Sequence, residues 1–457
     1  MSRLPVFKAY DIRGAVGPDL SEGFAFALGR AIATELGAQR VVIGRDARAS
    51  SPVLSAALAR GLQGSGVEVL DLGLCGTEEV YFATDHCRAQ GGVMVTASHN
   101  PITDNGFKLV GPGATPLPDA QFRAIETRVA AGPARASSAP GPYRELSCRD
   151  AYVERVLSFV DPSAMAPMHL FANAGHGAAG PTFDAVVERL QGQGAPLTVT
   201  RAFHAPDPSF PVGIPNPMLP ENQPLTRDGT RAAGADLGVA WDGDFDRCFF
   251  FDHQGAFVPG EYVVAALAQA LVARAPGSRI VHDARVAWNT QRVVRAAGGL
   301  PVMGQTGHAL MKTRMRAEGA IYGGELSAHH YFRDFMYCDS GMIPWLLMLA
   351  QISTTGRSLQ ESFAEMRALH PSSGEINFRV ADPEKAVAAV LADLAPEATE
   401  IDHTDGLSLS FADWRANLRN SNTEALLRLN VEARGEPDLV AEGVARITAL
   451  LRPFADA

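Results

Sequence analysis

The feature that most constrains the fold is one pattern of strands and helices that occurs three times along the sequence. Each copy begins with a short apolar strand, a turn and a helical stretch, followed by a second and a third strand. The expected strands cover residues 41–43, 67–70 and 92–95, then 169–171, 197–199 and 237–240, and then 279–281, 301–303 and 320–322. Strands that alternate with helices predict mostly parallel sheets covered on both faces. Each third strand runs into a polar loop, where such sheets bind ligands.

The last part of the chain, from about residue 372, follows a different pattern. It predicts strands at 376–380, 407–411 and 427–431 and helices at 383–394 and 437–452, which is typical of a small α+β domain. A segment rich in Pro, Gly, Ala and Ser at 131–147 interrupts the periodicity after the first copy. We therefore expect four domains, which span residues 1–147, 148–252, 253–370 and 371–457.

Charge and cysteine content exclude several classes of protein. The 40 Lys and Arg against 50 Asp and Glu give a net charge of −10, and there is no block of basic residues. A general nucleic-acid binder or a protein of anionic membranes is therefore disfavoured. The five cysteines are scattered and form no C-x-x-C pair, which favours reduced thiols. The first residues lack the apolar core of a signal peptide, so we expect a soluble, cytoplasmic protein that does not bind membranes.

The second polar loop, Asp242-Gly243-Asp244-Phe245-Asp246-Arg247, predicts a metal site. Its three carboxylates can converge on one hard cation, and oxygen ligands favour Mg²⁺ or Ca²⁺. The loop lies between two strands that are expected to be buried, where three close carboxylates would repel one another without a cation. The alternative is a solvated acidic turn. An EF-hand is excluded, because the longer loop with its terminal Glu is absent.

The first loop, residues 96–101, contains Ser98 at the end of an apolar strand, followed by His99. Ser98 could be a nucleophile or a phosphate carrier, although these six residues alone are more typical of a Ser/Asn turn. In the third loop, Glu325, Ser327 and His329 would point the same way if the loop is extended, and they suit sugar hydroxyls. His329 and His330 could instead suggest zinc, but a third soft ligand is lacking.

The last domain has a polar segment, Arg419-Asn420-Ser421-Asn422-Thr423-Glu424, that could form a phosphate cradle in a turn. An ordinary polar turn explains the motif equally well. Single residues elsewhere are further candidates. Lys108 follows the Ser98 loop on the next expected strand, and His308 is expected to end the second strand of the third copy. The others are Tyr10, Arg13 and Arg285.

Taken together, four motifs resemble those of the α-D-phosphohexomutase superfamily over essentially the whole chain. They are T-A-S-H-N-P at 96–101, D-G-D-F-D-R at 242–247, G-E-L-S-A-H at 324–329 and R-N-S-N-T-E at 419–424. The stretches at 7–14 and 328–335 also look like those of the bacterial phosphomannomutases that supply GDP-mannose. The resemblance implies an α/β fold, with three similar mixed α/β domains and a C-terminal α+β domain around a central cleft.

The resemblance also implies roles for particular residues. Ser98 would be a phosphoserine in the resting enzyme, and one of its oxygens, with Asp242, Asp244 and Asp246, would hold Mg²⁺. Arg247 would accompany that charge. The substrate would be bound by Glu325 and Ser327 at the sugar hydroxyls and by Arg419, Ser421, Asn422 and Thr423 at the phosphate that does not react. We assign Tyr10, Arg285 and His329 to the substrate site as well.

The chemistry of such a mutase agrees with this assignment. The two ends of a hexose are too far apart for direct transfer, so phosphoserine gives its group to the free hydroxyl, and the bisphosphate turns over and returns its other phosphate. A metal and cations must stabilise the transferring group. An acid and a base are needed too; His308, Lys108 and His99 are the candidates, with Arg13 nearby. Hexose 1,6-bisphosphate is the expected activator, and we expect a monomer or a weak dimer.

We therefore expect an isomerase of carbohydrate metabolism that interconverts mannose 6-phosphate and mannose 1-phosphate and supplies GDP-mannose synthesis. Glucose phosphates are a second substrate class and, in one alternative, the main one. Another alternative is an aspartyl-phosphate phosphatase with Asp242 as the nucleophile, but it leaves Ser98 unused. A third, a binding protein without activity, conflicts with the retained site residues. Leu326 and Ala328 replace the Gln and Gly expected of phosphoglucosamine mutases, and Arg285 stands where some members have Lys.

Overall fold

The computed structural model describes residues 4–132, 139–420 and 426–455 of the 457-residue chain. The chain divides into two compact units, each described here by itself. Unit 1 comprises Met1–Phe257 and Asp334–Gly356, and unit 2 comprises Val258–Arg333 and Arg357–Ala457. None of the helices in the described part of the chain is long and apolar enough to cross a bilayer.

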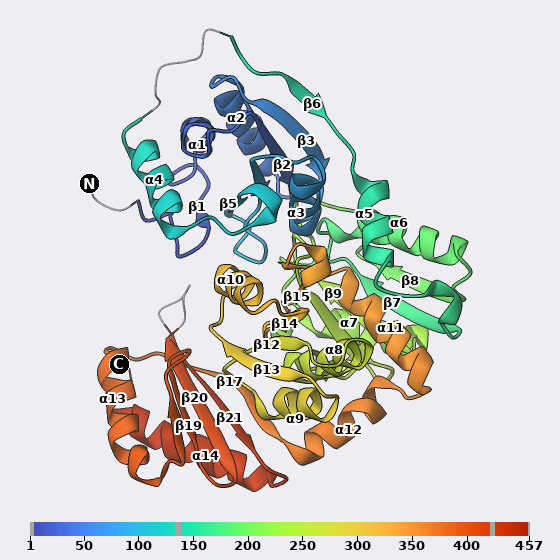
Figure 1. Ribbon diagram of the computed structural model, residues 1–457, viewed down its shortest axis with the longest axis vertical. Coiled ribbons are helices and arrows are strands. Elements are labelled where there is room, and N and C mark those ends of the chain that lie inside the picture. Colours follow the sequence, from blue (N-terminus) through green and yellow to red (C-terminus); the bar gives the residue numbers. More distant parts are fainter. Residues whose placement is uncertain (1–3, 133–138, 421–425, 456–457) are drawn as a thin grey trace. The chain divides into compact units, whose positions relative to one another are not determined.

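Unit 1 alternates strands with helices for most of its length (Figure 1). Its strands are β1 (Ile12–Ala15), β2 (Arg40–Arg45), β3 (Glu68–Leu74), β4 (Gly91–Val95), β5 (Asp104–Val110), β6 (Tyr143–Glu145), β7 (Met168–Asn173), β8 (Leu197–Ala202), β9 (Leu237–Trp241), β10 (Cys248–Asp252), β11 (Phe257–Val258) and β16 (Cys338–Asp339). Its helices are α1 (Glu22–Leu36), α2 (Ser51–Gln63), α3 (Thr77–His86), α4 (Asp119–Ala130), α5 (Arg149–Leu157), α6 (Ala179–Gly192), α7 (Pro224–Ala233) and α11 (Ile343–Thr355).

The first sheet has six strands in the order β1-β5-β4-β2-β3-β6. Strands β2, β3, β4 and β6 are parallel, and β5 pairs antiparallel with β4. Alternate residues of a strand point to opposite faces, and both faces are buried here. Val41 and Ile43 pack with residues of α1, α2 and α4, whereas Val42 packs with residues of α3. The near-continuous apolar runs of these strands follow from this double cover.

The second sheet of unit 1 repeats the same arrangement. Strand β7 lies between β8 and β9, parallel to both, and β10 pairs antiparallel with β9. The ring of Phe183, on α6, lies 5.2 Å from that of Trp241 on β9 and 5.3 Å from that of Trp345 on α11. These aromatic contacts join α6 and α11 to the end of β9, where the aspartate loop begins.

Unit 2 contains a third sheet and a fourth sheet. The elements of the first part are α8 (Gly260–Arg274), β12 (Arg279–Asp283), α9 (Trp288–Ala296), β13 (Leu300–Gly304), α10 (His308–Glu318), β14 (Tyr322–Gly324), β15 (His330–Phe332) and α12 (Leu359–Leu369). Strand β12 pairs in parallel with β13 and β14, and β15 pairs antiparallel with β14.

The fourth sheet is antiparallel, in the order β17-β21-β20-β19-β18. Its elements are β17 (Ser372–Phe378), α13 (Pro383–Leu394), β18 (Glu400–Asp402), β19 (Leu407–Ser410), β20 (Trp414–Asn420), β21 (Leu427–Ala433) and α14 (Pro437–Leu451). One face is apolar and packs on α13 and α14 (Figure 1). The other face carries buried polar residues at alternate positions, which include Arg415, Asn417 and Arg419 on β20.

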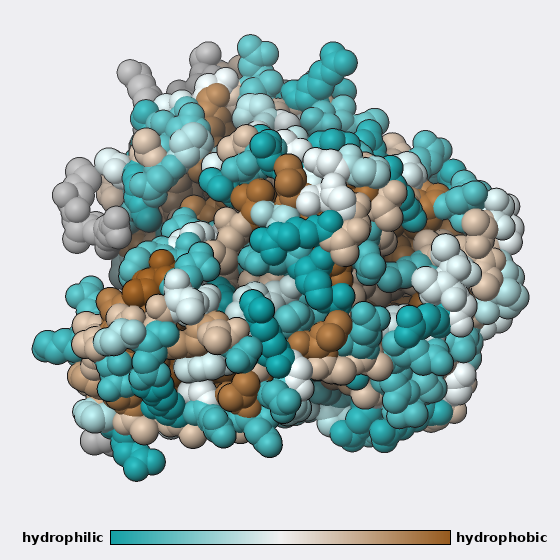
Figure 2. All heavy atoms as spheres, turned by 60° about the horizontal axis from the view of Figure 1, so that its bottom comes forward, coloured by the Kyte–Doolittle hydropathy of each residue, from teal (hydrophilic) through white to brown (hydrophobic). Residues whose placement is uncertain are grey.

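Short 3₁₀ helices complete the chain at Pro112–Ala114, Pro162–Ala164, Pro220–Asn222, Arg333–Phe335, Ala395–Glu397 and Arg452–Phe454. On the face shown in Figure 2, hydrophilic and hydrophobic residues are interspersed. The large hydrophobic side chains that are exposed in the described residues are scattered along the chain, at Val53, Ile102, Tyr143, Leu219, Leu225, Leu300, Leu369 and Ile401. Most large apolar side chains are therefore packed in the cores beneath the sheets.

The sheets confirm the predicted pattern, with two corrections. The third strand of the third copy is Tyr322–Gly324, so it begins where the predicted strand 320–322 ends. A Cβ at Gly323 would lie 2.5 Å from Met315 of α10, and one at Gly324 would lie 2.7 Å from Val264 of α8. Helices α10 and α8 pack so closely on this strand that only glycine fits at these two positions. The sequence also did not predict strands β1, β6, β11, β15, β16, β18 and β20.

Candidate active site

Ser98 lies just beyond the carboxyl end of β4 and is 2% exposed. Its backbone has a φ of 49°, in the left-handed region that residues other than glycine rarely adopt. The Ser98 hydroxyl donates a hydrogen bond of 2.6 Å to Asp242 Oδ2 and lies 3.0 Å from His99 Nδ1. The first and second predicted loops therefore meet at this hydroxyl.

Asp242, Asp244 and Asp246 lie in the turn between β9 and β10 and are all buried. One carboxylate oxygen from each lies within 4.8 Å of the others. Gly243 lets this turn approach the serine loop, because a Cβ there would lie 2.7 Å from the carbonyl oxygen of Ser98. The predicted convergence of the three carboxylates is confirmed.

Lys108 enters the same cluster from β5. Its ammonium donates to Asp244 Oδ2 at 2.7 Å and to Asp246 Oδ2 at 2.5 Å. Burial alone would lower the pKa of Lys108, but Asp244 and Asp246 outweigh it and raise the pKa above the usual value. Thr77, at the start of α3, donates a further hydrogen bond of 2.5 Å to Asp244 Oδ2. Lys108 therefore holds a positive charge beside the cluster.

The aspartate cluster fits a divalent cation. Burial raises the pKa of Asp242 to about 6; Arg247 opposes this shift, and Asp246 and Asp244 add to it. Within the described residues, Asp244 Oδ1 is buried and has no hydrogen-bond partner. A buried carboxylate oxygen without a donor is costly and is an available ligand atom. Three carboxylates and a serine oxygen are hard ligands, which suit Mg²⁺.

Arg247 and Arg13 add positive charge around Ser98 and His99. Arg247 donates two hydrogen bonds to Asp242 Oδ2, of 3.0 Å from Nε and 2.8 Å from the terminal nitrogen, and also contacts His99 Nδ1. Arg13 donates to Asp11 at 2.7 Å and to Asn100 Oδ1 at 2.7 Å. Burial, followed by Arg247 and Arg13, lowers the pKa of His99 well below its usual value, so the ring is neutral near pH 7.

Tyr10 is partly exposed, one residue before Asp11. It precedes β1 in unit 1, as do the first residues of the stretch at 7–14. The structure therefore places Ser98, His99, Lys108, Arg13, Arg247 and the three aspartates in one cluster.

In unit 2, Arg285 follows β12 and is buried among carboxylates. It donates to Asp283 Oδ2 at 2.6 Å and to Glu375 Oε2 at 3.1 Å, and lies 3.5 Å from Ser327 Oγ. Burial alone would lower the pKa of Arg285, but Asp283, Glu375 and Glu325 together raise it. Arg285 is therefore a fixed positive charge beside the predicted sugar loop.

The predicted sugar loop is a tight turn between β14 and β15, so an extended loop, the condition for its alternate side chains to point the same way, is not met. The N–H of Ala328 donates to the carbonyl of Glu325, that of Glu325 donates to the carbonyl of His329, and Ala328 has a φ of 68°. Glu325 is buried and accepts hydrogen bonds from the hydroxyl of Tyr331 at 3.0 Å and the N–H of Gly307 at 2.6 Å. Ser327 and His329 are partly exposed.

The two adjacent histidines of this loop have different surroundings. His329 stacks on Tyr331, with ring centroids 6.0 Å apart. His330 is buried in β15, 2.7 Å from the hydroxyl of Tyr322, and burial lowers its pKa to about 3. His330 is thus a neutral core residue, and the rings do not form a pair of zinc ligands.

Two further residues lie on other elements than we expected. His308 is the first residue of α10 and does not end β13, which stops at Gly304, because Gly307, with a φ of 126°, turns the chain into the helix. Arg419 lies on β20, so the predicted phosphate turn begins within a strand. It is 4% exposed and lies 3.7 Å from Glu375 and 3.9 Å from Asp405. Ser421, Asn422 and Thr423 lie outside the described residues.

Family models match four successive parts of the chain. The phosphoglucomutase/phosphomannomutase domains I, II and III match residues 5–136, 150–255 and 259–369, and the C-terminal domain of the same family matches residues 375–450. The chain belongs to the phosphoglucomutase/phosphomannomutase family. It is thus an isomerase of the phosphohexomutase type, and the resemblance inferred from the four motifs is confirmed.

Members of the family match this chain from end to end. A phosphomannomutase of Salmonella montevideo is 52% identical over 454 residues, which cover 99% of this chain and 100% of that protein. A phosphomannomutase of Escherichia coli K12 is 48% identical over 454 residues, with the same coverage. Among solved structures, a phosphoglucomutase/phosphomannomutase family protein of Burkholderia thailandensis has a TM-score of 0.87 at 30% identity and covers 100% of this chain and 99% of its own.

The family fold extends to more distant relatives. The N-acetylphosphoglucosamine mutase of Aspergillus fumigatus, solved in complex with GlcNAc-6P and magnesium, has a TM-score of 0.62 at 15% identity. It covers 99% of this chain and 96% of its own. This likeness shows the shared architecture of the phosphoglucomutase/phosphomannomutase family.

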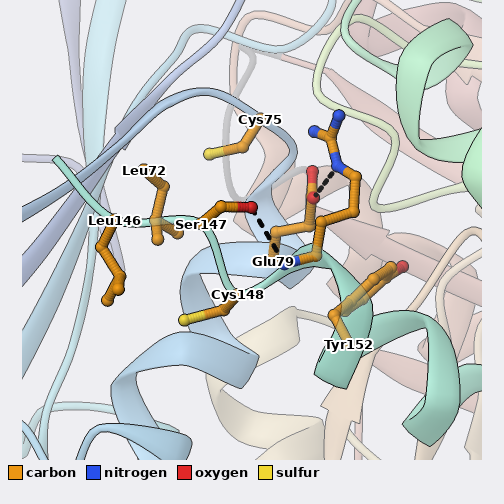
Figure 3. Close-up of a pocket in the computed structure, with 8 residues that line it drawn as sticks. Leu72, Cys75, Glu79, Leu146, Ser147, Cys148 and Tyr152 are labelled. Atoms are coloured by element: carbon orange, nitrogen blue, oxygen red, sulfur yellow. Dashed lines mark hydrogen bonds and ion pairs between the residues drawn. The ribbon is translucent and has the colours of Figure 1, made fainter.

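A small cavity next to α3 lies outside the cluster at Ser98 (Figure 3). It has a volume of about 30 Å³ and is lined by residues that include Cys75, Cys148 and Tyr152. Arg149 spans it and donates to Glu79 at 3.1 Å. The cavity has room for about one or two water molecules and none for a hexose.

Sequence reasoning missed three residues of this family member that hold the serine loop and the aspartates. Asp46 and Arg48 follow β2 directly, and Thr77 begins α3. The position of Asp46 and Arg48 gave a usable signal: β2 lies next to β4 in the sheet, so residues just after the two strands meet at one edge. Thr77 gave none, because its contact with Asp244 joins residues 167 positions apart.

Proposed function

We propose that this chain is an Mg²⁺-dependent phosphomannomutase, which interconverts mannose 6-phosphate and mannose 1-phosphate through a phosphoserine at Ser98 and a 1,6-bisphosphate. The observation that carries the proposal is the hydrogen bond of 2.6 Å from the Ser98 hydroxyl to Asp242, in a buried cluster of three aspartates. A phosphoryl group on this oxygen would lie beside the aspartates. The names of the full-length relatives support mannose phosphate as the substrate.

Asp242, Asp244 and Asp246 would hold the Mg²⁺ together with an oxygen of phosphorylated Ser98. When bound, the metal supplies positive charge that stabilises the transferring phosphoryl group. Lys108 and Arg247 contribute fixed charges on the protein side, since both already contact the aspartates. His99 and His308 remain candidates for the proton transfers to and from the sugar hydroxyl, with the positive charge of Arg13 nearby.

Unit 2 would supply the substrate groups. Glu325, Ser327 and His329 would bind the sugar, and Arg285 and Arg419 with Ser421, Asn422 and Thr423 would bind the phosphate that does not react. The turn between β14 and β15 leaves Ser327 and His329 partly exposed, which supports a binding role. The four domains would end near residues 147, 252 and 370. We place the enzyme in the cytoplasm, in the supply of GDP-mannose.

The test is ³¹P NMR of mannose 1-phosphate with the protein and Mg²⁺, with and without a trace of mannose 1,6-bisphosphate. We expect conversion to the 6-phosphate, and stimulation by the bisphosphate activator. Release of free phosphate would favour an aspartyl-phosphate phosphatase. No reaction of either mannose phosphate or glucose phosphate would refute a hexose phosphate mutase.

Phosphoglucomutase is the second candidate, because the matching family models carry the names of both activities. The same experiment with glucose 1-phosphate separates the two. A higher kcat/KM for the mannose compound supports the main proposal, and a higher value for the glucose compound would replace it.

A further inference from the structure

The loop that carries Ser98 is strongly bent, and a side chain from outside the loop helps to hold its shape. Ser98 has a φ of 49°, which is unfavourable for a residue with a side chain. The loop also turns four carbonyl groups inward, those of Ser98, Asn100, Pro101 and Asp104. Carbonyl groups that are withdrawn from water need donors, so the shape of this loop depends on whatever fills the space between them.

The side chain of Arg48 fills that space. One of its terminal nitrogens donates to the carbonyls of Ser98 at 2.9 Å and Asn100 at 2.6 Å. The other donates to the carbonyls of Pro101 at 2.8 Å and Asp104 at 3.0 Å. Arg48 is only 2% exposed. A planar guanidinium with donors in a fixed fork can reach four acceptors at once, whereas a lysine ammonium has three donors on one atom.

A second connection holds the other side of Ser98. The N–H of Ser98 donates to Thr96 Oγ1 at 2.8 Å, and that hydroxyl donates to Asp46 Oδ2 at 2.7 Å. Asp46 also accepts from the N–H of Arg48 at 3.0 Å, and the two side chains form an ion pair at 3.5 Å. Ser98 is thus held at its N–H through Asp46 and at its carbonyl by Arg48.

The metal loop lies against the same carbonyl. A Cβ at Gly243 would be 2.7 Å from the carbonyl oxygen of Ser98, so that oxygen lies between Gly243 and the guanidinium of Arg48. A shift of the Ser98 carbonyl would therefore move the Ser98 hydroxyl relative to Asp242, which it now contacts at 2.6 Å.

We propose that Arg48, with Asp46 and Thr96, is the positioning group of the phosphate-carrying serine: it sets the place of the Ser98 oxygen relative to the aspartate cluster. In the described residues, the side chain of Arg48 contacts the loop backbone and Asp46 and hydrogen-bonds to none of the three aspartates of the metal loop. The inference rests on the proposed function, since it concerns the efficiency of phosphoryl transfer through Ser98. It also separates two properties, because metal binding depends on the aspartates and phosphoryl transfer depends on where Ser98 stands.

The test compares Arg48→Lys with Arg45→Lys. Arg45 lies three residues earlier, and among the described residues its side chain pairs with Asp71 alone, at a long 3.5 Å, so it is the matched control. For Arg48→Lys we expect kcat to fall by about 100-fold, the scale of a displacement of about 1 Å at a reacting atom. The KM for mannose 1-phosphate and the affinity for Mn²⁺, measured by electron paramagnetic resonance, should stay unchanged. Arg45→Lys should match the wild type in all three.

A kcat of Arg48→Lys equal to that of the wild type would overturn the inference, and so would a loss that appears equally in Mn²⁺ affinity. If Arg48→Lys does not fold, Thr96→Val decides, since it removes only the hydroxyl link between Asp46 and the N–H of Ser98. Its kcat should fall while Mn²⁺ affinity is kept, and an unchanged kcat would overturn the inference. Failure of the proposed function looks different, because the wild type itself would then not interconvert the two phosphates.

Discussion

At the scale of single residues, the account depends on carboxylates that are brought together without enough donors. One oxygen of Asp244 accepts hydrogen bonds from both Lys108 and Thr77. Its other oxygen is buried without a hydrogen-bond partner among the described residues. This is the arrangement of a ligand whose remaining partner is a cation. The residue types and the spacing of the loop were enough to predict it.

Asp244→Asn should sharply weaken the binding of Mg²⁺. The amide removes one negative charge and offers only one oxygen, so we expect the Mg²⁺ concentration for half-maximal activity to rise by at least about tenfold. The measurement is activity against Mg²⁺ concentration. Asp228→Asn is the control, since Asp228 is exposed and pairs only with its neighbour Arg227. An unchanged Mg²⁺ response of Asp244→Asn would contradict the metal assignment.

Gly243→Ala tests the close approach of the two loops. A Cβ there would lie 2.7 Å from a backbone oxygen, which cannot move as a flexible side chain can. We expect a lower kcat and a loss of about 1–3 kcal/mol in the free energy of unfolding, the usual cost of overpacking. Gly192→Ala is the control, because its Cβ would meet nothing within 4 Å. Urea denaturation and steady-state kinetics measure both effects. If the two variants behave alike, the approach of the loops is not needed.

At the residue scale, sequence reasoning found the groups that sit in motifs and missed those that act through the backbone. Ser98 and the aspartates are recognisable because their chemistry needs those residue types at close spacing. Arg48 does its work by donating to carbonyl groups, which every residue has, so the acceptors leave no mark in the sequence. The position of Arg48 just after β2 is the only sequence feature that indicates its role.

At the scale of elements, periodicity predicted the strands that are apolar on both faces and missed β20, which has a buried polar face. Residues 414–420 alternate apolar side chains with Arg and Asn, and this polarity resembles a loop. In the structure, Arg415 of β20 forms an ion pair of 3.0 Å with Glu432 of β21, so the polar face is satisfied within the protein. Such long-range partners are invisible in a single sequence.

The hairpin of β14 and β15 makes a prediction about acid stability. Burial lowers the pKa of His330 to about 3, while an unfolded histidine titrates near 6.5. As the pH falls below about 6.5, the unfolded chain binds a proton that the folded chain refuses, so stability is lost. For each pH unit that the pH falls between about 6 and 4, the free energy of unfolding decreases by about 1.4 kcal/mol.

His330→Gln should remove this sensitivity, since glutamine can bond to the hydroxyl of Tyr322 and does not titrate. We expect the midpoint of acid-induced unfolding, followed by near-ultraviolet circular dichroism, to move to lower pH. His403→Gln, a change away from the hairpin, should leave the midpoint in place. Equal midpoints for wild type and His330→Gln would show that His330 does not limit acid stability.

At the scale of the whole molecule, the candidate groups divide between the two units. Unit 1 contains Ser98, the aspartates and Lys108, and unit 2 contains Glu325, Arg285 and Arg419. The overall charge of −10 repels phosphates, so an anionic substrate must be held by such local basic groups. The four motifs were enough to predict the family, which the comparison with known proteins confirms, whereas the division into two units was not predicted.

Arg419→Ala should therefore act on binding and not on the metal. Loss of a charged hydrogen bond to phosphate costs about 1.5–3 kcal/mol, which corresponds to a rise in KM for mannose 1-phosphate of about 10- to 100-fold. The Mg²⁺ dependence should stay as in the wild type. Arg446→Ala is the control, because Arg446 pairs with Glu397 on the surface of the same domain. An unchanged KM would remove Arg419 from the substrate site.

The central claim is that Ser98 carries the phosphate between the two ends of the sugar. The most direct test treats the protein with mannose 1,6-bisphosphate and Mg²⁺, locates the phosphoryl group by peptide mass spectrometry, and then adds unlabelled mannose 1-phosphate. The account predicts one phosphoryl group on Ser98, its loss to the sugar within the time of one turnover, and no phosphorylation or activity in a folded Ser98→Ala variant. A phosphoryl group on Asp242, or full activity in Ser98→Ala, would contradict it.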